Sequence, residues 1–328
     1  MSKEWLTEKN QFRYTIFPIK HQDIWNMYKQ AESCFWKTQE LDFSKDYEHF
    51  CKLDEDEKYF IKMILSFFAA SDTIVNMNLQ ENFINEVTVP EAKYFYDYQA
   101  ANENVHSETY STMIETLIKD DDEKIKLFNA IETIPSIKLK KDWAEKWIKN
   151  ANMLPFAQRL IAFAIVEGVF FSGSFCAIYW IKHKVSKNKE DLLPALTSSN
   201  EFIARDEGLH TTFACLLYSK IVNRMDEIIV HEMFKEAIEI ETHFICEALP
   251  CKLIGMNSDK MTEYIKYVAD SLLVKLGYSK LFNIKECPFS FMEAISMEGK
   301  TNFFERRPTQ YQKFEVDNDD FNLEDEGF

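Results

Sequence analysis

The chain has 328 residues, is 46% hydrophobic and carries a formal net charge of −16. This acidic composition disfavours nucleic-acid binding, which requires a basic face. Its seven cysteines include no Cys-x-x-Cys pair, which indicates reduced thiols in a cytoplasmic protein, and the charged N-terminus does not resemble a secretory signal. Because only 7 glycines and 8 prolines interrupt the chain, we expect long helices with short connections.

Helical periodicity and turn residues divide the chain into successive helices. An extended N-terminal arm (1–20) precedes an amphipathic helix at about 21–38. Asp54 and Glu57 form a predicted capping box for a helix that runs to about residue 85. After Pro90 we expect helices at about 91–119, 124–133, 137–150, 152–184, 192–224, 226–249 and 258–276. The predicted organisation is therefore the arm, a single helical domain (21–310) and a flexible acidic C-terminal tail (311–328).

Two apolar segments each carry a single charged residue. The first, 63–80, contains Asp72, and the second, 160–181, contains Glu167. By length and hydropathy the second segment would also qualify as a membrane span. The alternative is a helix buried on all sides in a large bundle, and the central carboxylates favour it, because a buried carboxylate is costly unless it is paired or metal-bound. We therefore expect two core helices and no membrane association.

Two Glu-x-x-His pairs lie 104 residues apart, at Glu103/His106 and at Glu207/His210. Residues three apart share one face of a helix. As a count, two pairs carry little weight, since roughly one is expected by chance, and each histidine could be a core residue bonded to a glutamate. However, two Glu-x-x-His helices with one carboxylate from each of two further helices form the constellation that holds two metal ions in helical bundles. The predicted ligands are Asp72, Glu103, His106, Glu167, Glu207 and His210.

The ligand types also indicate which metals the site would bind. Four carboxylates neutralise two divalent ions, and carboxylate oxygens with imidazole nitrogens suit non-haem iron or manganese better than a structural zinc. Six ligands for two ions leave coordination positions free for oxygen chemistry. Tyr110 follows one helical turn after His106, so it is either a core tyrosine or a redox-active phenol beside the metals. Phe171 and Phe175 would shield such a phenol from water.

Six segments in one order resemble the small, radical-generating subunit of class I ribonucleotide reductase, in its eukaryotic-type form. They are FFAASDTIVNMNL (67–79), ENVHSETY (103–110), VEGVFFSGSF (166–175), SNEFIARDEGLHTTFACL (199–216), EALPCKLIGMN (247–257) and EGKTNFFERR (298–307). The resemblance extends from about residue 17 to the C-terminus. It implies an all-α, ferritin-like helical bundle with a buried dinuclear metal site. That site would hold two iron ions per chain, with manganese as the alternative, on the six ligands named above.

The resemblance also implies roles for individual residues. The radical-bearing tyrosine falls on Tyr110, in an apolar pocket formed by Phe171, Phe175 and Ile203.

A long-range radical route is implied as well. It matches Trp36 and Asp206, meets the metal site at His106 and continues through Tyr311 as a mobile relay. From the sequence alone, Trp36 would be a core aromatic residue and Asp206 a solvated neighbour of Arg205. Both roles therefore rest on the resemblance.

The segment 315–328 carries seven acids and no base, interspersed with Phe321, Leu323 and Phe328. It is either a disordered solubilising tail or a segment that becomes ordered on a partner. In the family that we infer, such a tail docks the small subunit onto the large catalytic subunit. We therefore expect a cytoplasmic homodimer that serves ribonucleoside-diphosphate reduction to deoxyribonucleotides and binds neither nucleotides nor nucleic acid.

Three alternatives remain open at this point. A self-sufficient di-metal oxidase or oxygenase would need neither Tyr311 nor the acidic tail. An iron-storage protein would assemble into a large shell and mineralise many irons per chain. A non-catalytic paralogue could serve only as a scaffold, although the complete ligand set and Tyr110 argue against it.

Overall fold

The computed structural model describes residues 4–8, 13, 15–148, 154–186, 192–248 and 251–292. Within these residues the chain forms helices and no strands, which confirms the predicted all-α class. The elements are α1 (Gln22–Glu32), η1 (Thr38–Glu40), α2 (Asp46–Lys52), α3 (Glu55–Asn78), η2 (Leu79–Phe83), α4 (Ile84–Glu86), α5 (Pro90–Leu117), α6 (Asp121–Phe128), α7 (Ala130–Thr133), α8 (Pro135–Ile148), α9 (Phe156–Ile165), η3 (Val166–Phe170), α10 (Ser172–Ser186), α11 (Pro194–Ser219), α12 (Glu227–Thr242), η4 (His243–Ala248), η5 (Cys251–Ile254) and α13 (Ser258–Leu276).

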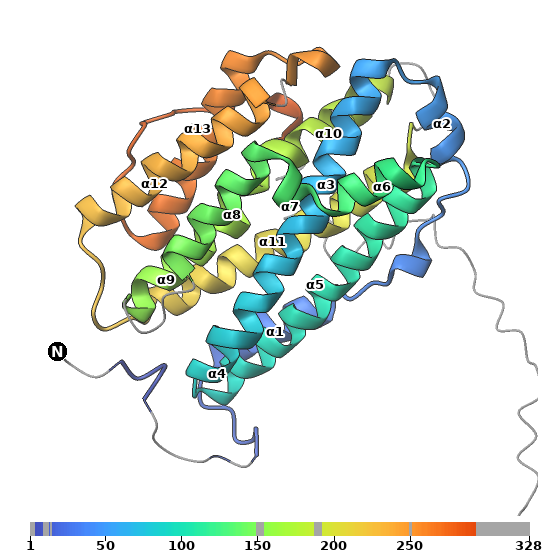
Figure 1. Cartoon of the computed structure of the whole chain (residues 1–328). Coiled ribbons are helices and arrows are strands. Elements are labelled where there is room, and N and C mark those ends of the chain that lie inside the picture. Colours follow the sequence, from blue (N-terminus) through green and yellow to red (C-terminus); the bar gives the residue numbers. More distant parts are fainter. Residues whose placement is uncertain are drawn as a thin grey trace, which may run out of the picture.

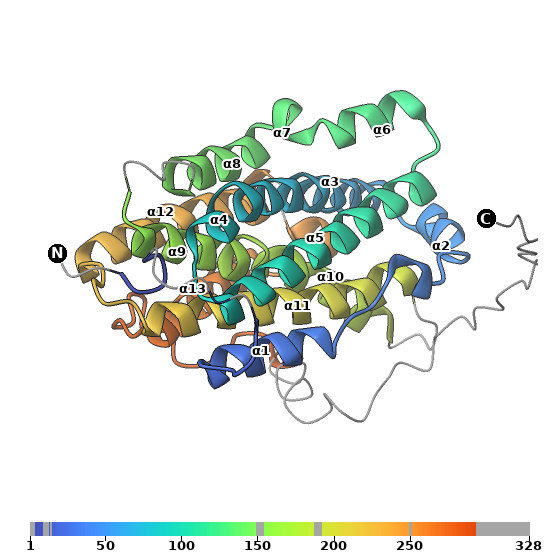
Figure 2. The same ribbon diagram turned by 90° about the horizontal axis from the view of Figure 1, so that it is seen from below.

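The long helices pack as a layered bundle, as Figure 1 shows. Helix α3 lies along α5, α9 lies along α11, and α10 also packs on α11. Helix α1 packs against α5 and α11, while α6, α7 and α8 cover the opposite side of α3 (Figure 2). Helices α12 and α13 pack on each other and close the side formed by α8, α9 and η3. One continuous hydrophobic core extends from Leu6 to Phe289.

The start of α3 follows the predicted capping signal. The Glu57 N–H donates to Asp54 Oδ1 at 2.8 Å, and Glu57 Oε2 accepts from the Asp54 N–H at 3.3 Å. These two bonds satisfy backbone donors that lack partners inside the helix. The rod α3–η2–α4 then ends at Glu86, close to the predicted end at about residue 85.

Helix α1 is shorter than the periodicity predicts, because it ends at Glu32 and not near residue 38. The residues that follow leave the helix and lie against α11. There the Arg205 guanidinium donates to the Cys34 carbonyl oxygen at 2.8 Å, and the Trp36 indole N–H donates to Asp206 at 2.7 Å. Tertiary hydrogen bonds therefore override the local helical pattern in this segment.

The two apolar segments belong to helices that are long and apolar enough to cross a membrane, Glu55–Glu86 and Phe156–Lys182. In the second helix, 94% of the most apolar window is buried inside the protein, against 56% in the first. Packing against the neighbouring helices thus accounts for the continuous apolar run of the second helix.

Among the described residues, three of the long rods contain a π-helical turn, at η2, η3 and η4. A π turn inserts one extra residue into a helix and is frequent at functional sites. The η3 turn carries Glu167, and Phe171 separates it from α10. Neither the predicted C-terminal tail (311–328) nor most of the polar loop at 186–191 lies among the described residues.

Candidate metal centre

Four elements bring the six predicted ligand side chains together at the centre of the bundle. They are α3, α5, η3 and α11. Each of these residues is at least 98% buried. The six are Asp72 from α3, Glu103 and His106 from α5, Glu167 from η3, and Glu207 and His210 from α11.

The two Glu-x-x-His helices face each other across the cluster. His106 Nδ1 lies 3.3 Å from Glu103 Oε2 and 3.1 Å from Glu207 Oε1. His210 Nδ1 lies 3.0 Å from Glu103 Oε1 and 3.1 Å from Glu207 Oε2. Each glutamate therefore directs one oxygen toward each histidine. Two carboxylates placed in this way lie between the two histidines and can serve two adjacent metal positions.

One further carboxylate completes each centre. Potential ligand atoms of Asp72, Glu103 and His106 lie within 4.8 Å of one another. The same holds for Glu103, Glu167, Glu207 and His210. The two groups share Glu103, so the cluster has two adjacent centres, each with one histidine and its own terminal carboxylate.

Several of these buried polar atoms have no hydrogen-bond partner. They include both oxygens of Asp72 and of Glu103, Nδ1 of His106, Oε2 of Glu167 and Oε1 of Glu207. Apart from the carboxylate–imidazole contacts of 3.0–3.3 Å described above, these atoms are unsatisfied, which is costly in a protein interior. A divalent cation in each centre would satisfy them, and oxygen donors with imidazole suit iron or manganese. The residues present therefore fit a dinuclear metal site.

The charges in the cluster lead to the same conclusion. Burial, followed by repulsion from Glu103, raises the pKa of Asp72 well above its usual value, and burial with Glu207 does the same for the pKa of Glu167. Burial opposes the charged form of His106, but the nearby carboxylates of Asp206, Glu103 and Glu207 outweigh burial and raise its pKa. Without cations these groups must take up protons, and cations would replace those protons.

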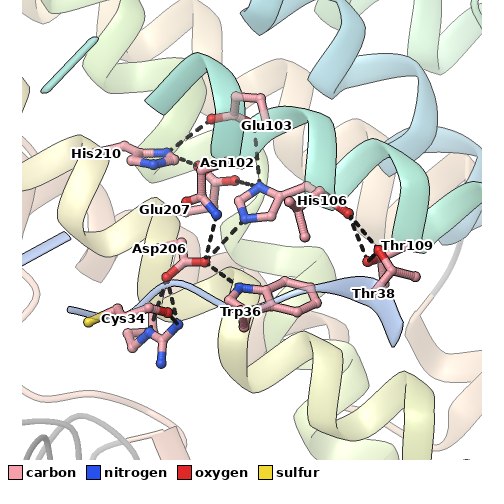
Figure 3. Close-up of polar contacts among 12 residues, drawn as sticks. Cys34, Trp36, Thr38, Asn102, Glu103, His106, Thr109, Asp206, Glu207 and His210 are labelled. Carbon is pink, nitrogen blue, oxygen red and sulfur yellow. Dashed lines mark hydrogen bonds and ion pairs between the residues drawn. The ribbon is translucent and has the colours of Figure 1, made fainter. Parts of the chain in front are cut away.

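A chain of polar contacts leads from the cluster to Trp36, as Figure 3 shows. His106 Nε2 lies 3.3 Å from Asp206 Oδ2, and the Trp36 indole N–H donates to the same oxygen at 2.7 Å. The Trp36 and His106 rings stack with centroids 6.1 Å apart. A hydrogen bond of 2.8 Å between the Thr38 and Thr109 hydroxyl groups holds the segment after Trp36 on α5.

Asp206 is buried, so the expectation of a solvated residue is wrong. Arg205 donates to its Oδ1 through Nε at 3.1 Å and Nη2 at 2.9 Å, and Asn102 Nδ2 donates to its Oδ2 at 3.3 Å. Burial would raise the pKa of Asp206, but Arg205 and His106 outweigh burial and lower it. This residue is therefore a carboxylate at neutral pH.

Sequence reasoning missed two amides that serve the site, Asn102 and Gln99. The Gln99 side chain donates to Glu167 Oε1 at 3.1 Å and so orients this carboxylate. Gln99, Asn102, Glu103 and His106 recur at helical spacing on one face of α5. This run of polar residues on a buried face was the signal that could have identified both amides.

Tyr110 lies one turn beyond His106, is 2% exposed, and its hydroxyl group has no hydrogen-bond partner. Its ring stacks on Phe68 with centroids 4.7 Å apart. Phe68 in turn stacks on Phe171 at 5.8 Å and on Phe175 at 5.1 Å. Phe171 and Phe175 thus lie one ring away from Tyr110, and Phe68, which was not predicted, is the ring stacked directly on it.

Burial and then the charges of Asp72, Glu207 and Glu103 raise the pKa of Tyr110 well above its usual value. The phenol is therefore neutral at physiological pH. Ile203, the third predicted pocket residue, is fully buried on α11. Tyr311, the predicted relay, lies outside the described residues.

The helical bundle and its cluster define the class of protein: a ferritin-like fold with a buried carboxylate–histidine cluster that can hold two metal ions. Comparison with known proteins then gives the family. Residues 13–288 match the family model of the ribonucleotide reductase small chain.

The chain is 52% identical over 316 residues to the ribonucleoside-diphosphate reductase subunit M2 of Danio rerio, over 96% of this chain and 80% of that protein. It is 54% identical over 308 residues to the small chain of Variola virus, over 94% of each. The chain therefore belongs to the ribonucleotide reductase small-chain family and is the small-subunit component of a ribonucleoside-diphosphate reductase. Membership implies a large-subunit partner.

Solved structures agree with this assignment. The Rnr4 homodimer of Saccharomyces cerevisiae superposes with a TM-score of 0.78 at 34% identity, over 90% of this chain and 93% of that one. The dimanganese(II)-NrdF of Streptococcus sanguinis shares the fold, with a TM-score of 0.70 at 19% identity, over 89% and 99% of the two chains.

Proposed function

We propose that this small chain holds two iron ions on its six central ligands and produces a radical on Tyr110. The oxidising equivalent would then pass to the large subunit, which reduces ribonucleotides to deoxyribonucleotides. The observation that carries this proposal is the set of buried ligand atoms without partners beside an enclosed tyrosine whose hydroxyl group is also unpaired. We further propose that the chain acts as a homodimer in the cytoplasm.

Asp72, Glu103, His106, Glu167, Glu207 and His210 would hold the metal ions. When bound, two ferrous ions with O₂ supply the oxidising equivalent for Tyr110. The neutral Tyr110 phenol would give one electron to this oxidant and the proton on its Oη to the oxygen that is reduced, which leaves a neutral radical. Phe68 covers one face of the ring, and Phe171 and Phe175 stack on Phe68, so these apolar rings would keep water and reductants away from the radical.

The transfer route would begin at His106 and pass through Asp206 to Trp36. Asp206 accepts hydrogen bonds from the indole and from Arg205, and it contacts His106, so it fixes the two rings relative to each other. Beyond Trp36, the proposed route uses Tyr311, and the acidic tail would bind the large subunit.

Electron paramagnetic resonance (EPR) of the apo-protein after addition of Fe²⁺ and O₂ tests the proposal. We expect a tyrosyl doublet in the wild type and none in Tyr110→Phe. Tyr96→Phe is a matched control, because Tyr96 is also on α5, fully buried and without a partner for its hydroxyl group. It should retain the doublet.

Two bound irons without any radical in the wild type would contradict the proposal for iron. The same experiment with Mn²⁺ then tests the alternative metal.

A further inference from the structure

A buried ion pair outside the metal cluster has no part in the function proposed above. Lys140 of α8 and Glu241 of α12 are 3% and 0% exposed, and Lys140 Nζ lies 2.5 Å from Glu241 Oε2. The ammonium group is enclosed by aromatic rings, with the Phe67 and Phe244 centroids at 3.7 and 3.9 Å. Stability alone does not explain a buried ion pair, because apolar residues of similar volume often stabilise a protein equally well.

The pair contacts the main chain where η3 meets α10. Lys140 Nζ donates a hydrogen bond of 2.8 Å to the carbonyl oxygen of Phe170, the last residue of η3. Glu241 Oε1 lies against Gly173, in the first turn of α10, at a place where a Cβ atom would not fit. A cation at the C-terminal end of one helix and an anion at the N-terminal end of the next are both favourable.

The close approach of Glu241 requires glycine at position 173. A Cβ atom on Gly173 would lie 2.5 Å from Glu241 Oε1 and 3.2 Å from Ile245 Cγ2. Real Cβ atoms do not come this close to an oxygen, so any larger residue would displace the carboxylate. The glycine and the ion pair therefore form one unit at the junction between η3 and α10.

This junction determines how two functional side chains point. Glu167 lies in the η3 turn, and Phe171 immediately follows it. Because a π turn inserts one residue, shifting it by one position rotates the side chains around it by about 100°. Such a shift would turn Glu167 away from His210 or Phe171 away from Phe68.

We propose that Lys140 and Glu241 are positioning residues that fix the place of the η3 turn and thereby the direction of the Glu167 carboxylate. This inference rests on the proposed function, in which Glu167 is a metal ligand. Lys140 bonds to the carbonyl oxygen of Phe170, and Glu241 lies against Gly173, which has no side chain, so the pair acts on the ligand through the backbone.

The test uses the full-length apo-protein and the double variant Lys140→Met/Glu241→Leu, which replaces the ion pair with apolar residues. Binding of Mn²⁺ alone is measured by isothermal titration calorimetry. We expect two sites in the wild type and, in the double variant, at least one of them weakened about tenfold or more, the usual effect of removing a group that orients a metal ligand.

A second ion pair, in which Arg159 is buried and Glu86 is partly exposed, provides the control. Arg159, on α9, pairs with Glu86, which lies in α4 at the far end of the α3–η2–α4 rod. Arg159→Met/Glu86→Leu should therefore leave Mn²⁺ affinity unchanged. Hydrogen exchange at 166–175 in the apo-protein adds a metal-free measurement, and we expect faster exchange only in the Lys140/Glu241 double variant.

Wild-type affinity together with wild-type exchange in the double variant would overturn the inference. Failure of the wild type to bind two Mn²⁺ ions would instead count against the proposed function. If the double variant does not fold, Glu241→Gln is measured in its place, since it keeps the size of the side chain and removes only the charge. The inference then requires weaker Mn²⁺ binding by this variant than by the wild type.

Discussion

Asp206 shows how one buried residue can connect two parts of a site. It lies beside the ligand Glu207 in the sequence, yet its carboxylate points toward Trp36 and His106. Arg205 and Asn102 donate further hydrogen bonds to the Asp206 oxygens, so this carboxylate keeps its negative charge in the interior. A residue that is fixed from four sides in this way can define the distance between two rings.

Trp36→Phe removes the indole N–H and keeps an aromatic ring. We expect the Tyr110 doublet to form normally, because the metal ligands are unchanged. Turnover with the large subunit should fall by roughly 100-fold, which is the usual effect of misplacing a group that takes part in a reaction. Loss of one hydrogen bond to a charged group should cost about 1.5–3 kcal/mol of stability. EPR and a reductase assay measure the first two effects separately, and urea unfolding measures the third.

Trp143→Phe is the control, because Trp143 is buried on α8 with an unpaired indole N–H. Turnover should match the wild type. Unchanged turnover in Trp36→Phe would remove Trp36 from the route.

The metal ligands were predictable from the sequence because Glu-x-x-His spacing and helix geometry fix which side chains share a face. Glu103 and His106 follow from this rule, and Tyr110 follows as the residue one turn on. Phe68 did not follow from it. Its place depends on how α3 packs against α5, and the sequence of a single helix does not contain that information.

At the level of elements, helix starts were predicted better than helix interruptions. Asp54 and Glu57 mark the start of α3 by their chemistry, since their side chains satisfy backbone N–H groups. No residue type in the sequence indicates the π turn at η3 in the same way. Because α9 and η3 are apolar on nearly all sides, an inserted residue does not disturb any visible pattern.

Single and double substitutions of the Lys140–Glu241 pair should differ in stability. Lys140→Met leaves an unpaired buried carboxylate, and we expect a loss of about 3–5 kcal/mol, whereas Lys140→Met/Glu241→Leu should be close to the wild type. Urea unfolding at pH 7 measures both values. Equal losses in the single and double variants would show that the pair is itself a major source of stability.

At the level of the whole molecule, metal removal should make stability depend on pH. In the apo-protein the pKa values of Asp72, Glu167, His106 and His210 are all raised above their usual values of 3.8, 4.5, 6.5 and 6.5. The folded apo-protein therefore binds more protons than the unfolded chain, and its stability falls as the pH rises through the folded-state pKa values.

Bound cations replace these protons, so the metal-loaded protein should depend less on pH. We expect the difference in melting temperature between samples with Mn²⁺ and samples with a chelator to widen from about pH 6 to about pH 8, the range in which histidine charge changes. At Mn²⁺ concentrations about 100 times the Kd, each site adds about 2.7 kcal/mol. Thermal unfolding by circular dichroism measures the difference, and a difference that narrows with rising pH would contradict the expectation.

The four elements that supply the ligands span the chain from Asp72 to His210, and they meet only when the bundle is assembled. A single helix presents at most two of these ligands close together, on α5 or on α11. Both centres are therefore complete only after all four elements have packed. Loading with two metal ions would thus report that the bundle has completed its fold.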